Sequence, residues 1–253
     1  MPLYKELSSI ASSQPRLPLV FLVDTSGSMR AASKKNPIEQ VNCFLEKIPT
    51  ELLDYRCDYI DLAVVEFGDT AKIVREFAPI ATFTGVRLEA DGMTAMGEGI
   101  RISYEMLNSL RRQYLEGGQT YYRPIILMLT DGEATDDIEQ AKEIIAANCK
   151  KTSFWAAGIE GCNQEQLSEL TKNSLFVDIN EIGLSEFLCW FFSDLVGVYF
   201  KERRNIEGYN PLIPPGVHPI NDVKQKRSKK DDIPGDCPQL PPTPPMQWDD
   251  WLD

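Results

Sequence analysis

The chain has 253 residues, of which 43% are hydrophobic and 25% are charged, which is typical of a globular protein with one sizeable domain. Its formal net charge of −12 disfavours non-specific binding to nucleic acid or to an anionic membrane surface. The six cysteines form no Cys-x-x-Cys pair, the N-terminus lacks the apolar stretch of a signal peptide, and no segment is long and apolar enough for a transmembrane helix. We therefore expect a protein of the reducing cytoplasm without membrane attachment.

The first predicted element is a strand over residues 19–24, where the apolar run LVFLV ends at Asp24. Such a continuous apolar run is typical of a strand that is buried on both faces of a parallel sheet. Ser26 and Ser28 follow in a tight loop around Gly27, which brings one carboxylate and two hydroxyls to one place. These oxygen groups suit a hard divalent cation such as Mg²⁺. Because Asp and Ser are also preferred helix N-caps, the motif alone is equally consistent with a capping role.

The remaining elements alternate between strands and helices. Apolar or alternating runs predict strands at residues 59–67, 70–77, 124–130, 153–159 and 175–179. Helical spacing and terminal signals predict helices at residues 37–48, 97–115, 135–147, 165–171 and 185–204. The first two of these strands are expected to form an antiparallel hairpin at a sheet edge. The long loop between residues 78 and 96 is typical of a functional loop.

This order predicts an α/β fold with a doubly wound, mostly parallel six-stranded sheet and one antiparallel edge strand. We assign residues 1–17 to an N-terminal arm, residues 18–207 to the α/β domain, and residues 208–253 to a C-terminal tail that is disordered or docks onto a partner. Ligands of such sheets bind at the carboxyl ends of the strands, where the strand order reverses. Asp24 and Asp131 each follow an apolar strand, so adjacent strands would bring the two carboxylates together.

Three separate segments complete the candidate metal site: DTSGS at residues 24–28, Thr94 in the long loop, and Asp131 in LMLTDGE. In order, strand context and spacing they resemble the metal-ion-dependent adhesion site (MIDAS) of von Willebrand factor A (vWA) domains, which have a Rossmann-like fold. The resemblance implies that the hydroxyls of Ser26, Ser28 and Thr94 contact a Mg²⁺ ion, or a Mn²⁺ or Ca²⁺ ion in its place. It implies that Asp24 and Asp131 act directly or through water, and that one coordination position stays open for an Asp or Glu of a partner protein.

Within the vWA group, the segments LVFLVDTSGSM, NPIEQVN, LTDGEATDD and SEFLCWFFSDL are most similar to bacterial TerY-like proteins linked to tellurite resistance. This resemblance implies an adaptor or regulator in a bacterial stress-resistance or defence system. The implied partners are a Ser/Thr kinase and a PP2C-type phosphatase of the same operon. The loop GMTAMG departs from the GGTSLG of close relatives, since Met93 replaces a glycine while Thr94 keeps its place.

Catalysis is the main alternative to binding. Phosphatases of the haloacid dehalogenase type also place Asp-x-Asp after the first strand, but here Ser26 stands at the second position and supplies no carboxyl proton. The only histidine, His218, lies in the proline-rich stretch PPGVHPI, so no Ser-His or Cys-His couple is expected at the strand ends. We therefore expect no catalytic residues and no enzyme activity. A metal-dependent phosphatase-like enzyme, and a structural subunit held by its tail with an idle metal site, stay open as alternatives.

The predicted tail is rich in proline and contains the basic run KQKRSKK at residues 224–230. Such runs are usually solvated, so contact with nucleic acid or an acidic partner is the less favoured interpretation.

The last residues of the tail predict a short docking peptide. Trp248, Trp251 and Leu252 lie at i, i+3 and i+4, so one helical turn would present an apolar face. We hypothesise that this face docks onto a partner or onto the domain itself. A neighbouring aspartate (Asp249, Asp250 or Asp253) is then a candidate for the open metal position.

Overall fold

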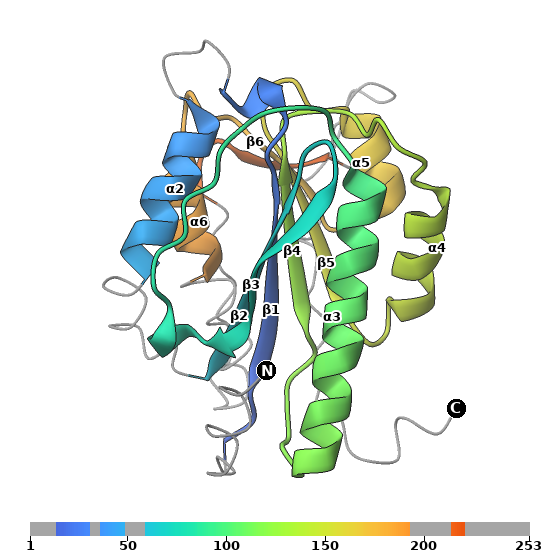
Figure 1. Ribbon diagram of the computed structural model, residues 1–253. Helices are drawn as coiled ribbons and strands as arrows, with labels where there is room; N and C mark the ends of the chain where they lie inside the picture. The colour runs from blue at the N-terminus through green and yellow to red at the C-terminus, as the bar shows by residue number, and fades with distance from the viewer. Residues whose placement is uncertain (1–13, 31–35, 49–58, 193–213, 221–253) are drawn as a thin grey trace, which may run out of the picture.

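Seven strands form a single sheet in the described part of the chain, and helices cover both of its faces (Figure 1). The computed structural model describes residues 14–30, 36–48, 59–192 and 214–220. The strands are β1 (Leu17–Asp24), β2 (Ile60–Phe67), β3 (Ala71–Pro79), β4 (Ile125–Thr130), β5 (Ser153–Gly158), β6 (Ser174–Val177) and β7 (Val217–Pro219). The α-helices are α2 (Pro37–Lys47), α3 (Met96–Gly117), α4 (Glu139–Asn148), α5 (Gln164–Leu170) and α6 (Leu184–Trp190), and the 3₁₀ turns are η1 (Gly27–Arg30) and η4 (Ile80–Thr82).

The sheet is parallel through its centre, with the order β3-β2-β1-β4-β5-β6-β7. Strand β1 pairs with β2 on one side and with β4 on the other, so that Leu19 is aligned with both Leu62 and Ile125. Every residue of β1 is buried, because strands flank it and helices cover both faces of the sheet. This burial explains why its sequence is continuously apolar and does not alternate.

Two hydrophobic cores fix the sheet between its helices. On the face that carries α2 and α6, Phe21 packs edge-on against Phe44 with ring centroids 6.2 Å apart, and Phe192 joins them. The opposite face carries α3, α4 and α5 (Figure 1), and α3 buries Ile100 and Leu107 there. A fully buried large apolar side chain contributes roughly 1.5–3 kcal/mol. The two cores therefore hold the strand ends, and the loops that follow them, in fixed positions.

Both edges of the sheet are antiparallel. The hairpin of β2 and β3 is confirmed at one edge. At the other edge β7 pairs with β6, which makes seven strands where the sequence predicted six. Strand β7 is short, follows Gly216 with a φ of +84°, and ends at Pro219, so its sequence carries no strand periodicity. It lies in the segment that was assigned to the tail, and the mostly parallel, doubly wound architecture is otherwise confirmed.

Several predicted features lie outside the described residues. They include most of the N-terminal arm, the end of the last predicted helix beyond residue 192, and the basic run. The docking residues Trp248, Trp251 and Leu252 also lie outside, together with the aspartates beside them.

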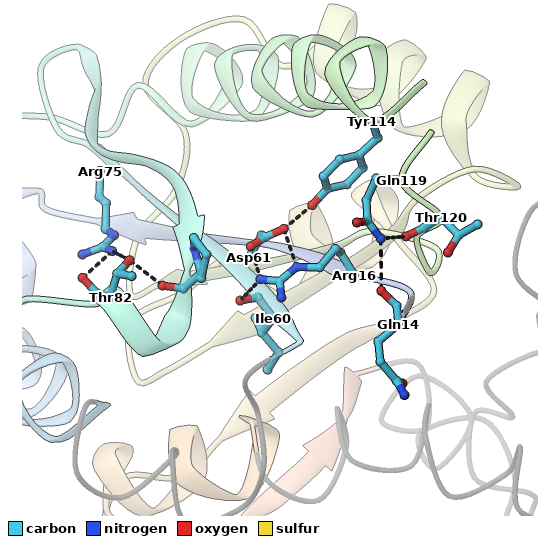
Figure 2. Close-up of polar contacts among 10 residues, drawn as sticks. Gln14, Arg16, Ile60, Asp61, Arg75, Thr82, Tyr114, Gln119 and Thr120 are labelled. Carbon is cyan, nitrogen blue, oxygen red and sulfur yellow. Dashed lines mark hydrogen bonds and ion pairs between the residues drawn. The ribbon is translucent and has the colours of Figure 1, made fainter. Parts of the chain in front are cut away.

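A buried ion pair ties the amino ends of β1 and β2 to α3 (Figure 2). The guanidinium of Arg16 pairs with the carboxylate of Asp61, which also accepts a hydrogen bond from the hydroxyl of Tyr114. The backbone N–H of Arg16 donates to the carbonyl of Thr120 over 3.0 Å, and its carbonyl accepts from the N–H of Tyr122 over 2.7 Å. This network fixes the start of β1 at the end of the sheet opposite to Asp24.

Candidate metal centre

The candidate site lies at the carboxyl ends of β1 and β4, the point where the strand order reverses. The chain leaves β1 to form β2 and β3 on one side, and it returns through α3 to place β4 on the other side (Figure 1). Asp24 is the last residue of β1, and Asp131 follows Thr130, the last residue of β4. The topology therefore brings the two carboxylates to the same end of the sheet, on neighbouring strands, as the sequence predicted.

The loop after β1 is folded back on Asp24. The backbone N–H of Ser26 donates to Oδ1 of Asp24 over 2.8 Å, and the Oγ atoms of Ser26 and Ser28 lie 2.9 Å apart. The turn η1 begins within this loop, whereas α2 begins later, with Asn36 at its N-cap position and no side-chain capping bond. The carboxylate and the hydroxyls therefore do not cap α2, and they face each other instead.

Hydrogen bonds join this loop to the end of β4. Oγ of Ser28 donates to Oδ1 of Asp131 over 2.7 Å. The hydroxyl of Thr130 donates to Oδ2 of Asp24 and accepts from the N–H of Gly132, which is 3.1 Å away. Side chains of both strand ends thus form one connected polar group.

Thr94 reaches the same place from the loop before α3. Its N–H donates to Oγ1 of Thr135 over 3.1 Å, and its carbonyl accepts from the N–H of Thr135 over 2.9 Å. A Cβ atom added to Gly132 would lie 3.4 Å from Oγ1 of Thr94 and 3.6 Å from Oδ2 of Asp24. The hydroxyl and the carboxylate therefore border one small space, which the missing side chain of Gly132 leaves open.

Sequence reasoning missed three residues that build this arrangement. Thr130 orients Asp24, Thr135 holds the Thr94 loop, and Gly132 leaves space between Thr94 and Asp24. A polar residue at the end of an apolar strand is a usable signal for Thr130. The roles of Thr135 and Gly132 depend on contacts between distant segments, so the sequence carries no local signal for them.

One predicted role was wrong. The helix predicted at residues 135–147 would place Asp136 in its first turn, but α4 begins only at Glu139. The carboxylate of Asp136 instead accepts hydrogen bonds from the N–H groups of Gly97 and Glu98, at 3.0 and 2.9 Å. It therefore stabilises the amino end of α3, where unpaired N–H groups and the helix dipole favour a negative charge.

Burial dominates the electrostatics of the two aspartates. Asp24 has no exposed surface, and burial raises its pKa to about 6. Hydrogen bonds from Thr130 and Ser26 lower this pKa, and the negative charge of Asp131 raises it. Burial also raises the pKa of Asp131, against the hydrogen bond from Ser28. Among the described residues, no lysine or arginine forms an ion pair with either carboxylate.

The residues present fit a hard divalent cation. Two buried carboxylates without a positive partner are costly when both are ionised, and a cation between them offsets that cost. Together with the hydroxyls of Ser26, Ser28 and Thr94 they form an all-oxygen donor set, which Mg²⁺, Mn²⁺ and Ca²⁺ prefer. The described residues contain no group of three or more His, Cys, Asp or Glu side chains that could hold a metal, so any site here depends on hydroxyls as well as carboxylates.

Burial affects the nearby thiol of Cys162. Burial, with a smaller contribution from the charge of Asp131, raises the pKa of Cys162 to about 11. Because the thiolate is the reactive form, this shift disfavours reaction of Cys162 at neutral pH.

Comparison with known proteins identifies the domain. The model of the family described as von Willebrand factor type A domain matches residues 19–183. The collagen alpha-5(VI) chain of Mus musculus is 22% identical over 162 residues, which are 63% of this chain and 6% of the collagen chain. None of the helices in the described ranges combines the length and the hydropathy of a membrane span.

Solved structures share the fold at low sequence identity. A von Willebrand factor type A protein from Catenulispora acidiphila has a TM-score of 0.54 and 18% identity, over 72% of this chain and 43% of that one. Proximal thread matrix protein 1 from the mussel byssus, solved with a zinc-occupied MIDAS motif, has a TM-score of 0.50 and 18% identity, over 71% of this chain and 47% of that one. The chain thus spans less than half the length of these two structures.

Proposed function

Because the chain belongs to the von Willebrand factor type A domain family, we propose that it is a metal-dependent protein-binding module with its cation between Asp24 and Asp131. Domains of this family are often metal-dependent protein-interaction modules. The observation that carries the proposal is the pair of buried carboxylates, joined through the hydroxyls of Ser26, Ser28 and Thr130 without a positive partner among the described residues.

The ligand roles are those that the resemblance to the MIDAS of vWA domains implies. The hydroxyls of Ser26, Ser28 and Thr94 would hold the cation, and Asp24 and Asp131 would bind it directly or through water. A metal with few anionic ligands stays electrophilic, so a carboxylate from a partner gains a strong charge-assisted contact. We propose Mg²⁺ as the resident ion, since the hard oxygen donors match it. The zinc in the mussel protein supports a divalent cation at this kind of site.

The wider role rests on resemblance to TerY-like proteins. We propose an adaptor or regulator in a bacterial stress-resistance or defence system, in the cytoplasm, with a Ser/Thr kinase and a PP2C-type phosphatase as partners. We further propose that the protein binds without catalysing a reaction, because no histidine is among the described residues that form the site and the raised pKa of the nearby Cys162 disfavours its thiolate.

Metal binding by the full chain tests the proposal first. The thermal midpoint of unfolding, measured with increasing Mg²⁺ against EDTA, is expected to rise for the wild-type chain and to stay constant for Asp24→Ala. Asp178→Asn is the matched control, because this carboxylate follows β6 at the same end of the sheet but away from β1 and β4. Its response to Mg²⁺ should equal that of the wild type. Partner capture should then be lost both with EDTA and in Asp24→Ala.

A further inference from the structure

Acidic side chains surround the candidate metal centre. The loops that frame it are residues 25–30, 68–70, 91–95, 131–138 and 159–163. Outside the site itself, their exposed acids are Asp69, Asp91, Glu133, Asp137 and Glu160, which we call the acidic rim. Arg30 is the one lysine or arginine within these ranges. The ranges leave out residues 31–35, which include Lys34 and Lys35 and which the structure does not describe.

Contacts place the rim close to the site. Oδ1 of Asp69 accepts from the N–H of Met93, the neighbour of Thr94, over 2.8 Å. The N–H of Asp91 donates to the carbonyl of Thr25 over 2.8 Å, and Thr25 is the residue between Asp24 and Ser26. Next to Glu160, a Cβ atom on Gly161 would lie only 2.7 Å from the carbonyl oxygen of Asp131. These contacts hold Asp69, Asp91 and Glu160 within one or two residues of the proposed ligands, and Glu133 lies two positions after Asp131 in the chain.

The rim determines which ligand can approach. A divalent cation between two ionised aspartates is formally neutral, so the remaining charge on the described framing loops is that of the five rim acids, the partly buried Asp136 and Arg30. The Debye length at physiological salt is about 8 Å, so the rim charges still act on a ligand that reaches the metal. A segment rich in acids would be repelled, whereas a lone carboxylate flanked by positive charges would be attracted.

Met93 is an exposed apolar residue next to Thr94 in the chain. Its side chain is 59% exposed, and with Ile73 it is one of the two exposed large hydrophobic residues among those described. The backbone at Met93 is held in place, because its N–H donates a hydrogen bond to the carboxylate of Asp69. The preceding Gly92 has a φ of +82°, and the Asp69 carboxylate occupies the place where a Cβ atom of residue 92 would lie. A flexible thioether side chain adapts well to an apolar partner surface.

Resting on the proposed function, we infer that the partner presents a basic segment with a single Asp or Glu for the metal, flanked by Lys or Arg and by an apolar residue that covers Met93. The acidic rim selects the basic flanks, and the exposed side chain of Met93 selects the apolar neighbour. The occupant of the open position is thus a protein segment of defined chemistry.

Synthetic peptides on the full chain test this inference. The probe Lys-Lys-Leu-Glu-Leu-Lys-Lys is labelled for fluorescence anisotropy and titrated at low ionic strength with saturating Mg²⁺ and with EDTA. The comparison peptides replace its Glu by Gln, its lysines by serines, or its lysines by aspartates. The lysine-flanked probe is expected to bind about tenfold tighter than the serine-flanked one. Binding of the lysine-flanked probe should be lost in EDTA, and the peptide with Gln in place of Glu should not bind. This result distinguishes metal-dependent binding from non-specific attraction of a basic peptide to an acidic protein.

Charge variants locate the effect. The double variant Glu133→Gln, Glu160→Gln should have an affinity for the lysine-flanked probe that is about three- to tenfold lower at low salt. The control combines Glu116→Gln with Glu143→Gln, which removes the same charge from exposed positions on α3 and α4 outside the rim, and should leave the affinity unchanged. Met93→Gly should weaken binding of the probe about threefold. It should not change the binding of a probe in which both leucines are replaced by serines.

The outcomes separate this inference from the proposed function. If Mg²⁺ does not stabilise the chain, the proposed function fails and the inference fails with it. If Mg²⁺ stabilises the chain but the serine- or aspartate-flanked peptide binds as tightly as the lysine-flanked one, only the inference is overturned. The inference alone is also overturned if Mg²⁺ stabilises the chain but no peptide shows Mg²⁺-dependent binding.

Discussion

Ser28 and Asp131 lie 103 positions apart in the chain, and the hydroxyl of the first donates a 2.7 Å hydrogen bond to the carboxylate of the second. This contact links the loop after β1 to the residue that follows β4, and it joins two of the residues proposed to hold the cation. Ser28 is exposed, so the contact contributes little to folding. Its value is to hold a hydroxyl beside the carboxylate.

Replacing Ser28 by alanine should therefore lower metal affinity without unfolding the protein. We expect Ser28→Ala to weaken Mg²⁺ binding about tenfold and to change the free energy of unfolding in EDTA by no more than about 0.5 kcal/mol. Isothermal titration with Mg²⁺ and urea unfolding measure the two quantities. Ser109→Ala, at an exposed position of α3, is the control. Equal Mg²⁺ affinity in Ser28→Ala and wild type would exclude Ser28 as a ligand.

Neutralising Asp24 should stabilise the metal-free protein while it removes the response to metal. The buried carboxylate has no positive partner among the described residues, so Asp24→Asn relieves its desolvation. At neutral pH in EDTA we expect the free energy of unfolding to rise by about 1–3 kcal/mol. Added Mg²⁺ should stabilise the wild type and not the variant. A variant that is less stable than the wild type in EDTA, or that still responds to Mg²⁺, contradicts this assignment.

The stability of the metal-free protein should fall as pH rises through the range in which Asp24 titrates. The folded pKa is about 6 and the ordinary value is 3.8, so between them the folded chain binds more protons than the unfolded chain. The free energy of unfolding therefore decreases with rising pH, by about 3 kcal/mol from this group across the range. Other carboxylates titrate as well, so the measured quantity is the difference between wild type and Asp24→Asn in EDTA. A difference that is constant with pH would show that Asp24 has an ordinary pKa.

A methyl group at Gly132 should block the cation. The added Cβ atom would make ordinary contacts with Thr94 and Asp24, at 3.4 and 3.6 Å, so the fold should tolerate it. It would occupy the space between their oxygens. We expect Gly132→Ala to abolish Mg²⁺-dependent stabilisation and to change the free energy of unfolding in EDTA by less than about 1 kcal/mol. Retained Mg²⁺ binding would place the cation elsewhere.

The ion pair at the opposite end of the sheet should affect stability alone. Asp61→Asn removes the negative charge that pairs with the guanidinium of Arg16 in a largely buried network. Loss of one partner of a buried pair costs about 3–5 kcal/mol, so the thermal midpoint should fall strongly. The further rise on adding Mg²⁺ should equal that of the wild type. A smaller Mg²⁺ response would reveal coupling between the two ends of the sheet.

The sequence predicted those parts of the fold and site that local patterns determine. The apolar runs before Asp24 and Asp131 predicted two parallel strands, and general knowledge of such sheets predicted that their carboxyl ends meet. It did not predict β7, which is too short and too rich in turn residues to show a period. It also assigned Asp136 to the wrong helix, because the N–H groups that it caps belong to α3, far away in sequence. Contacts of this kind depend on the packing of distant segments.

The central claim is that one divalent cation binds among Asp24, Ser26, Ser28, Thr94 and Asp131. Anomalous diffraction from crystals grown with Mn²⁺ tests it most directly, because the ion is located without assumptions about its ligands. The account predicts a single strong peak at about 2.1–2.3 Å from Oγ of Ser26 and Oγ of Ser28, in the space beside Gly132. A peak elsewhere on the chain, or none at this site while the carboxylates stay in place, would contradict it.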